Sequence, residues 1–277
     1  MSEAISTDSA EIENAMNSFL DLGHSLFALA IIALGIETLV CAATLTGNLI
    51  ETSRFGAAIG PTLAACGVDL LLKRTLRAAA LTLGTLPFAY SVVFEVPKYA
   101  AAPGNMGFRT LVFELLAIAT LGWLLPGRDA VPNGLAVLSR CLLAVSFIVF
   151  GVDHFLGLAF IATLVPNWIP WHVFWITFFG AGFIAAGLSI GLNFRLRWGA
   201  AGIGLMFAVW VFTLHLPRTL FGLAGGSGPH SPAEWSSLFI AIALWGGSWA
   251  LAGRRVEANG RGSAGPTPTV SRVSSNG

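Results

Sequence analysis

The sequence predicts an all-α polytopic membrane protein, a helical bundle of eight transmembrane helices built as two parallel four-helix repeats. Three observations lead to this fold class. Of the 277 residues, 55% are hydrophobic and only 10% are charged, whereas soluble domains average about 25% charged residues. The apolar residues fall in eight long blocks, with all Lys and Arg between the blocks or at their edges. The second half of the chain also repeats features of the first.

Each apolar block has the length that a transmembrane helix needs, roughly 17–25 residues. The stretches between the blocks carry the Pro, Gly and Asn residues that end helices. We place the spans at 25–46, 55–72, 77–97, 109–126, 136–158, 171–192, 198–217 and 235–252.

The basic residues orient the chain in the membrane. With eight spans both termini lie on one side, and eleven of the fifteen Lys and Arg share that side. The other side holds Arg54, Lys98, Arg109 and Arg218. Under the positive-inside rule, both termini are expected in the cytoplasm.

The two halves of the chain align with each other. "AACGVDLLLKRTLR" (64–77) matches "IAAGLSIGLNFRLR" (184–197), and "FEVPK" (94–98) matches "LHLPR" (214–218), at one offset of 120 residues. Four spans per half is an even number, so the halves share one orientation and are related by an axis along the membrane normal. Two further matches join "ALGIETL" (33–39) to "VFGVDHF" (149–155), and "LLPGR" (124–128) to "ALAGR" (250–254).

This organisation divides the chain into four parts. The first is an acidic cytoplasmic segment, and the last is a Gly/Ser/Pro-rich cytoplasmic tail without an apolar face, which we expect to be disordered. The parts are the N-terminal segment 1–23, the first repeat 24–128, the second repeat 136–254 and the tail 255–277.

Ionisable residues inside the spans are the candidate site. Asp153 is thirteen residues beyond Arg140 at the cytoplasmic edge, which is about 20 Å into an apolar core about 30 Å thick. Each such group costs at least about 2.5–3.5 kcal/mol at the helix centre, so it must face inward and find a partner. The repeat places similar groups in the outer half of the bilayer. The candidate proton-relay or binding cluster is Asp153, His154, Glu37, Glu95 and His215.

Partners for this cluster follow from helix geometry. Asp153 and His154 are adjacent and point about 100° apart, so we expect each to find a partner on another helix, with His215, Glu95, Glu37 and Glu114 as candidates. Arg218 and Lys98 are also expected to extend toward the same cluster. Structural pairing between helices, worth about 0.6 kcal/mol per pair, is the alternative to a functional cavity.

The remaining motifs narrow the function classes. The three cysteines stand singly in apolar blocks, which predicts no metal site, and no basic stripe points to nucleic acid. We expect Trp168, Trp171 and Trp175 in an outer aromatic girdle, with Trp123 and Trp198 in an inner one.

The second half resembles the DoxX family of bacterial four-span membrane proteins over about 115 residues. The resemblance rests on Arg140, "GVDHF" (151–155), "LVPNWIPW" (164–171), "FFGAGFIAAGLSIGL" (178–192), "RLRWGAAGIGL" (195–205) and the Pro217 that ends span seven. The family often carries a Glu in the small-residue helix, where this chain has Phe183 and, in the first copy, Leu63. The resemblance implies the bacterial inner membrane as location and a link to membrane redox chemistry.

Three functional hypotheses follow. The first is a quinone-interacting subunit of a membrane oxidoreductase, with other subunits and lipid as partners. His154 or His215 would donate to the quinone, and Asp153, Glu37 and Glu95 would relay protons; haem ligation by the two histidines is disfavoured. The second is a small-molecule transporter or binding protein, although no helix carries the central Pro/Gly break typical of transporters. The third is a non-catalytic membrane scaffold, so enzyme activity stays open.

Overall fold

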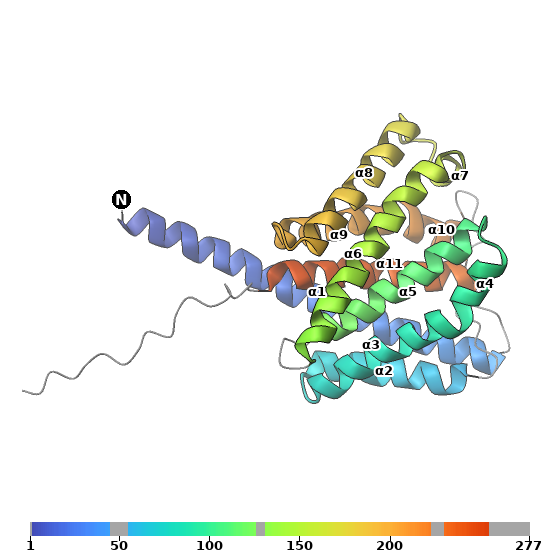
Figure 1. Cartoon of the computed structure of the whole chain (residues 1–277), viewed down its shortest axis with the longest axis horizontal. Helices are drawn as coiled ribbons and strands as arrows, with labels where there is room; N and C mark the ends of the chain where they lie inside the picture. The colour runs from blue at the N-terminus through green and yellow to red at the C-terminus, as the bar shows by residue number, and fades with distance from the viewer. Residues whose placement is uncertain (1, 45–54, 126–130, 223–229, 255–277) are drawn as a thin grey trace, which may run out of the picture.

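The computed structural model describes residues 2–44, 55–125, 131–222 and 230–254, and these residues form an all-helical bundle (Figure 1). The predicted disordered tail 255–277 lies outside the described residues. The helices are α1 (Ser2–Thr44), α2 (Gly56–Leu72), α3 (Leu76–Tyr90), η1 (Ser91–Glu95), α4 (Val96–Ala101), α5 (Met106–Leu124), α6 (Asn133–Leu156), α7 (Leu158–Leu164), α8 (His172–Gly191), α9 (Leu196–Trp210), η3 (Val211–His215), α10 (Leu216–Phe221) and α11 (Pro232–Gly253).

The described residues contain seven helical runs that are long and apolar enough to cross a membrane. Two of these runs are composite, because α3, η1 and α4 continue one another, as do α9, η3 and α10. The remaining predicted span corresponds to α2, an apolar helix of 17 residues that is shorter than the others. The chain is therefore a multi-pass membrane protein.

Helix α1 is much longer than the span predicted within it. Its 43 residues extend for about 65 Å, roughly twice the thickness of the apolar core of a bilayer. Its N-terminal part projects beyond the bundle in Figure 1. The segment 1–23 is therefore helical from Ser2 onward.

The two halves of the bundle interlock. The first helix of each half packs against the second helix of its own half and the last helix of the other. Thus α1 lies against α2 and α11, and α6 lies against α8 and α5. One continuous hydrophobic core includes Phe27 and Leu70 from the first half and Phe147 and Ile203 from the second.

Matching glycines bring the paired helices close together. A Cβ on Gly35 of α1 would lie 2.6 Å from the carbonyl oxygen of Gly60 in α2. A Cβ on Gly151 of α6 would lie 2.6 Å from the carbonyl oxygen of Gly180 in α8. Small residues permit such backbone contact, which stabilises helix pairs in membranes.

A second matching contact places a tryptophan over a glycine. Trp123 of α5 covers Gly84 of α3, and Trp249 of α11 covers Gly204 of α9. Trp123 is buried at 5% exposure, so its predicted place in an inner girdle is wrong. The glycine leaves a flat site on the neighbouring helix, and the indole fills it.

Two π-helical turns interrupt the composite spans at equivalent positions. In η1 the Val96 amide donates to the Ser91 carbonyl, and in η3 the Leu216 amide donates to the Val211 carbonyl. Pro97 and Pro217 follow directly; because proline has no N–H, the carbonyls of Val93 and Thr213, four residues earlier, lose their usual helical donor. The spans were predicted to end at these prolines, but the helices continue to Ala101 and Phe221.

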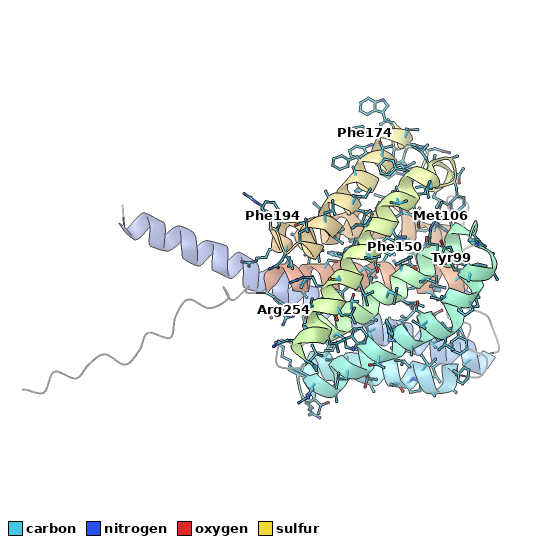
Figure 2. The ribbon with its side chains drawn as sticks, in the orientation of Figure 1. Tyr99, Met106, Phe150, Phe174, Phe194 and Arg254 are labelled. Carbon is cyan, nitrogen blue, oxygen red and sulfur yellow. The ribbon has the colours of Figure 1, made fainter. Side chains whose placement is uncertain are left out.

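The two ends of the bundle differ in character. Phe194 and Arg254 lie at the end from which α1 projects, and Tyr99 and Met106 lie at the opposite end (Figure 2). The first end also carries the α2–α3 turn with Lys73 and Arg74, and the α8–α9 turn with Arg195. We call these the basic end and the cavity end.

Candidate functional site

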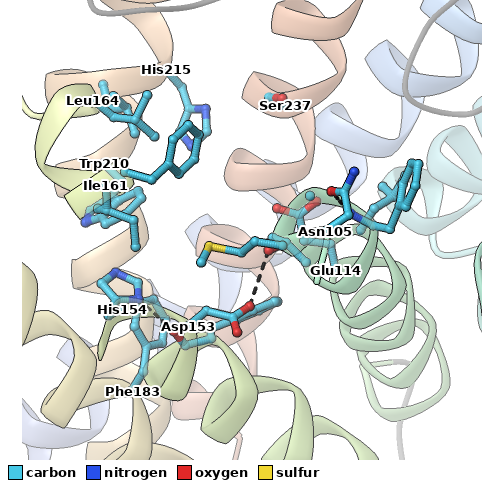
Figure 3. Close-up of a pocket in the computed structure, with 18 of the residues that line it drawn as sticks. Asn105, Glu114, Asp153, His154, Ile161, Leu164, Phe183, Trp210, His215 and Ser237 are labelled. Atoms are coloured by element: carbon cyan, nitrogen blue, oxygen red, sulfur yellow. Dashed lines mark hydrogen bonds between the residues drawn. The ribbon is translucent and has the colours of Figure 1, made fainter. Parts of the chain in front are cut away.

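A cavity of about 670 Å³ opens between the two halves near the cavity end, and we call it the polar cavity (Figure 3). Four of the five predicted site residues line it: Glu95, Asp153, His154 and His215. They come from η1, α6 and η3. Residues far apart in the sequence thus meet at one site.

Asp153 is held by α5. Its Oδ1 forms an ion pair with Nη2 of Arg109 at 2.5 Å, and the Thr110 hydroxyl donates to Oδ2 at 3.4 Å. The carboxylate was expected to find a partner on another helix, and it does, but the partner is none of the four predicted. Arg109 lies at the start of its span, and its long side chain reaches Asp153 along apolar surface.

His154 finds a partner on its own helix, so the prediction of a partner on another helix is wrong for this residue. Its Nδ1 lies 2.6 Å from the carbonyl oxygen of Phe150. A carbonyl only accepts, so Nδ1 carries the hydrogen, and Nε2 of the neutral ring is an acceptor. This Nε2 is buried and has no hydrogen-bond partner among the described residues.

Aromatic rings fix the orientation of the His154 imidazole. Its centroid lies 5.3 Å from that of Phe183 and 5.1 Å from that of Trp210. His215 lies on the other side of Trp210, at 6.5 Å between centroids. The His215 Nδ1 is also buried without a hydrogen-bond partner in the described part of the chain. Two imidazoles from different helices therefore flank one indole beside the cavity, as Figure 3 shows.

Acidic and basic groups alternate around the cavity. Glu95 is 1% exposed; its Oε1 accepts from Lys98 at 3.1 Å, and its Oε2 is buried without a partner among the described residues. Arg218 pairs at 2.8 Å with Glu234, which sequence reasoning missed. Lys98, Arg109 and Arg218 each meet a carboxylate, so the basic side chains that line or border the cavity are neutralised.

Glu37 does not line the polar cavity. Its Oε1 accepts from the Ser236 hydroxyl of α11 at 2.8 Å, and the Cys41 thiol lies 3.7 Å from the same oxygen. This contact is the counterpart of Thr110 with Asp153, since 153 − 37 = 116 and 236 − 110 = 126 match the offsets of the aligned segments. Glu37 lies on α1, whereas Asp153 lies on α6 and lines the polar cavity. Glu95 and His215, also counterparts, line the same cavity.

Apolar side chains complete the wall of the polar cavity. They include Phe160, Ile161 and Leu164 of α7, with Phe183 and Phe207 behind the imidazoles. Glu114 and Ser237 lie opposite, on α5 and α11 (Figure 3). The arrangement suits an uncharged ligand with hydrogen-bonding groups on an apolar frame.

Among the residues that the structure describes, no three His, Cys, Asp or Glu side chains form a group that could hold a metal ion. No family model matches the chain, and no curated protein or solved structure matches it.

Proposed function

We propose that this chain is a DoxX-like protein of a bacterial inner membrane and binds the ring of a quinone in the polar cavity, as one subunit of an oxidoreductase. In this proposal two copies of a four-helix unit make eight spans, with both termini in the cytoplasm. The matched Gly–Gly crossings, Gly–Trp contacts, π-turns and hydroxyl–carboxylate contacts support the duplication.

The short helix α2 counts as a span in this proposal. Its 17 residues extend for about 25 Å, near the lower limit for crossing the membrane. Gly67 meets Ala28 and Ile32 of α1, and Gly60 meets Leu39. The order of these contacts makes α2 antiparallel to the apolar part of α1, which is the arrangement that a full crossing requires.

One observation carries the ligand proposal: His154 and His215, from different helices, both line the polar cavity, and each has a buried ring nitrogen without a partner among the described residues. In this proposal each of the two nitrogens meets one of the two oxygens of a quinone ring. The neutral His154 presents an acceptor, so it receives the hydroxyl hydrogen of the reduced, quinol form. The donor role toward the oxidised form therefore falls to His215.

The proposed reaction moves two electrons and two protons between quinone and quinol. The protons pass through His154 and the carboxylates Asp153 and Glu95, which lie in the same cavity. The electrons pass to or from a partner subunit of the enzyme. Glu37 was predicted as a relay member; since it lies outside the cavity, its role is to hold α1 to α11.

Quinone retained by the protein tests this function. After purification in mild detergent, extracted quinone is quantified for wild type, His154→Gln and His215→Gln. Wild type is expected to retain quinone, and each variant to lose most of it. His172→Gln is the matched control, because His172 begins α8 and contacts the Pro166 carbonyl away from the polar cavity. Equal quinone in all four proteins, or none in wild type after quinone is added back, would contradict the proposal.

A small-molecule transporter is the second candidate, and the paired π-turns favour it. Interrupted helices at corresponding positions of two repeats are a mark of transport sites, and η1 and η3 end at the cavity residues Glu95 and His215. Ser237→Cys, with Cys41, Cys66 and Cys141 replaced by Ala, separates the two candidates. A transporter exposes this cysteine to impermeant maleimide from both membrane faces, whereas the proposed quinone site exposes it from one face at most.

A further inference from the structure

A second cavity, of about 710 Å³, lies beside the polar cavity, and we call it the aromatic groove. It is bounded by α8, α9 and the segment that joins α7 to α8, and its walls carry Trp171, Trp175, Phe178 and Phe179. Four residues line both cavities: Ile161, Leu164, Trp210 and Leu214. The two spaces therefore share one wall.

The apolar space continues toward the basic end of the bundle. A third hollow, of about 580 Å³, shares Gly182, Gly202 and Met206 with the aromatic groove and reaches Arg195 and Trp198. A Cβ on Gly202 would meet nothing within 4 Å, so the side of α9 that lines these hollows is open at this position. A nearly unbroken apolar path thus runs along α8 and α9, with polar groups concentrated in the cavity at one end.

We infer that the ligand of the polar cavity is an amphiphile whose long apolar tail lies in the aromatic groove between α8 and α9. This inference rests on the proposed function and names the quinone class, a ring with an isoprenoid-type tail. The ring lies against His154 and His215, and the tail passes Trp210 and follows the glycines of α8 and α9. The groove holds the tail by packing against its aromatic and aliphatic walls in place of lipid chains.

At the polar cavity the charges favour an uncharged quinone ring over a phosphate head group; a lipid whose phosphate meets Arg195 at the other end of the path is the competing occupant. A phosphate head group needs a cation free to receive it. Lys98, Arg109 and Arg218 are already in ion pairs with Glu95, Asp153 and Glu234. An uncharged head group avoids the like-charge contact that a phosphate would make with these three carboxylates.

Filling the groove tests the inference. Gly202→Leu places a side chain in open space, and Gly134→Leu at the start of α6 is the matched control, since its Cβ also meets nothing within 4 Å. The proteins are reconstituted in nanodiscs and titrated with a benzoquinone that has no tail and with the same ring carrying a decyl tail. Each variant is compared with wild type for one probe at a time, so that partitioning of the probe into lipid cancels.

Gly202→Leu is expected to weaken decylquinone binding by about tenfold, because the new side chain occupies the place of the tail and removes its packing contacts with the groove. Binding of the tail-less ring should stay within about twofold of wild type, and Gly134→Leu should match wild type for both. Unchanged decylquinone binding by Gly202→Leu overturns the inference and leaves lipid as the occupant of the groove. If wild type binds neither probe, both the tail site and the proposed quinone function are contradicted. If wild type binds both probes and Gly202→Leu changes neither affinity, only the tail site is contradicted.

Discussion

At the scale of single residues, the ion pair of Arg109 and Asp153 makes a charged group tolerable at the edge of the apolar core. Asp153 is 4% exposed, and an unpaired carboxylate there would lose its hydration without compensation. The same physics applies to Glu95 with Lys98 and to Glu234 with Arg218. In each case one long basic side chain, from residues near the cavity end, reaches the acid.

We expect Asp153→Asn or Arg109→Gln alone to cost more stability than the two changes together. Each single change leaves the other partner charged and buried, which we expect to cost about 3 kcal/mol. This is the lower end of the range for buried pairs, because the Arg109 side chain is 18% exposed. A double-mutant cycle of unfolding in detergent measures the coupling. Additive losses would show that the pair contributes no coupling.

The sequence could predict that Asp153 and His154 lie within the membrane but could not identify their partners. The depth of Asp153 in the membrane follows from the number of residues that separate it from Arg140, multiplied by the rise per residue of an α-helix. The partner of Asp153 depends on how far an Arg side chain extends, and the partner of His154 is a carbonyl of its own helix. Glu234 was missed because its position just before a span resembles a solvated helix start, although its burial at 2% shows otherwise.

At the scale of helices, close backbone contact depends on glycine in both halves. A methyl group on Gly151 would meet the Gly180 carbonyl and the Ile184 backbone amide, and backbone cannot move aside as a flexible side chain can. Gly151→Ala should therefore lower the thermal stability in detergent, by about 1–3 kcal/mol. Gly202→Ala, whose Cβ meets open space, is the matched control and should be neutral or slightly stabilising, because Ala favours helix. Equal effects at both positions would refute the role of close contact.

The positions of the helices were predictable because apolar blocks separated by charged and turn residues specify spans directly. The π-turns were not, because Pro97 and Pro217 resemble helix ends in the sequence. Proline removes only one backbone donor, so a helix can continue past it, and both composite spans do so with a π-turn directly before the proline. Repetition of proline at the same offset was the available signal, since a helix end needs no such conservation of position between the two halves.

At the scale of the whole molecule, the second half carries the aromatic side chains of the site, whereas the corresponding part of the first half is nearly closed. Phe150, Phe183 and Phe207 line the polar cavity. Their counterparts Leu34, Leu63 and Pro87 surround a void of only about 20 Å³. In the second half the three rings pack against one another and form one wall of the cavity. The aligned counterpart of the pair Asp153–His154 is Glu37–Thr38, which keeps the acid and lacks the imidazole.

The side of the membrane on which the N-terminus lies depends on whether α2 crosses. Lys73 and Arg74 precede α3, and Arg195 precedes α9, so under the positive-inside rule we expect this end of the later helices to face the cytoplasm. If α2 crosses, α1 begins on that same side, and if α2 does not cross, α1 begins outside.

A reporter that is active only in the cytoplasm, fused before Met1, is therefore expected to be active. The same reporter fused after Gly277 is the control and should be active in either case, because seven or eight spans leave the C-terminal end with the basic turns. An inactive N-terminal fusion beside an active C-terminal one would reduce the count to seven and remove the parallel orientation of the two halves.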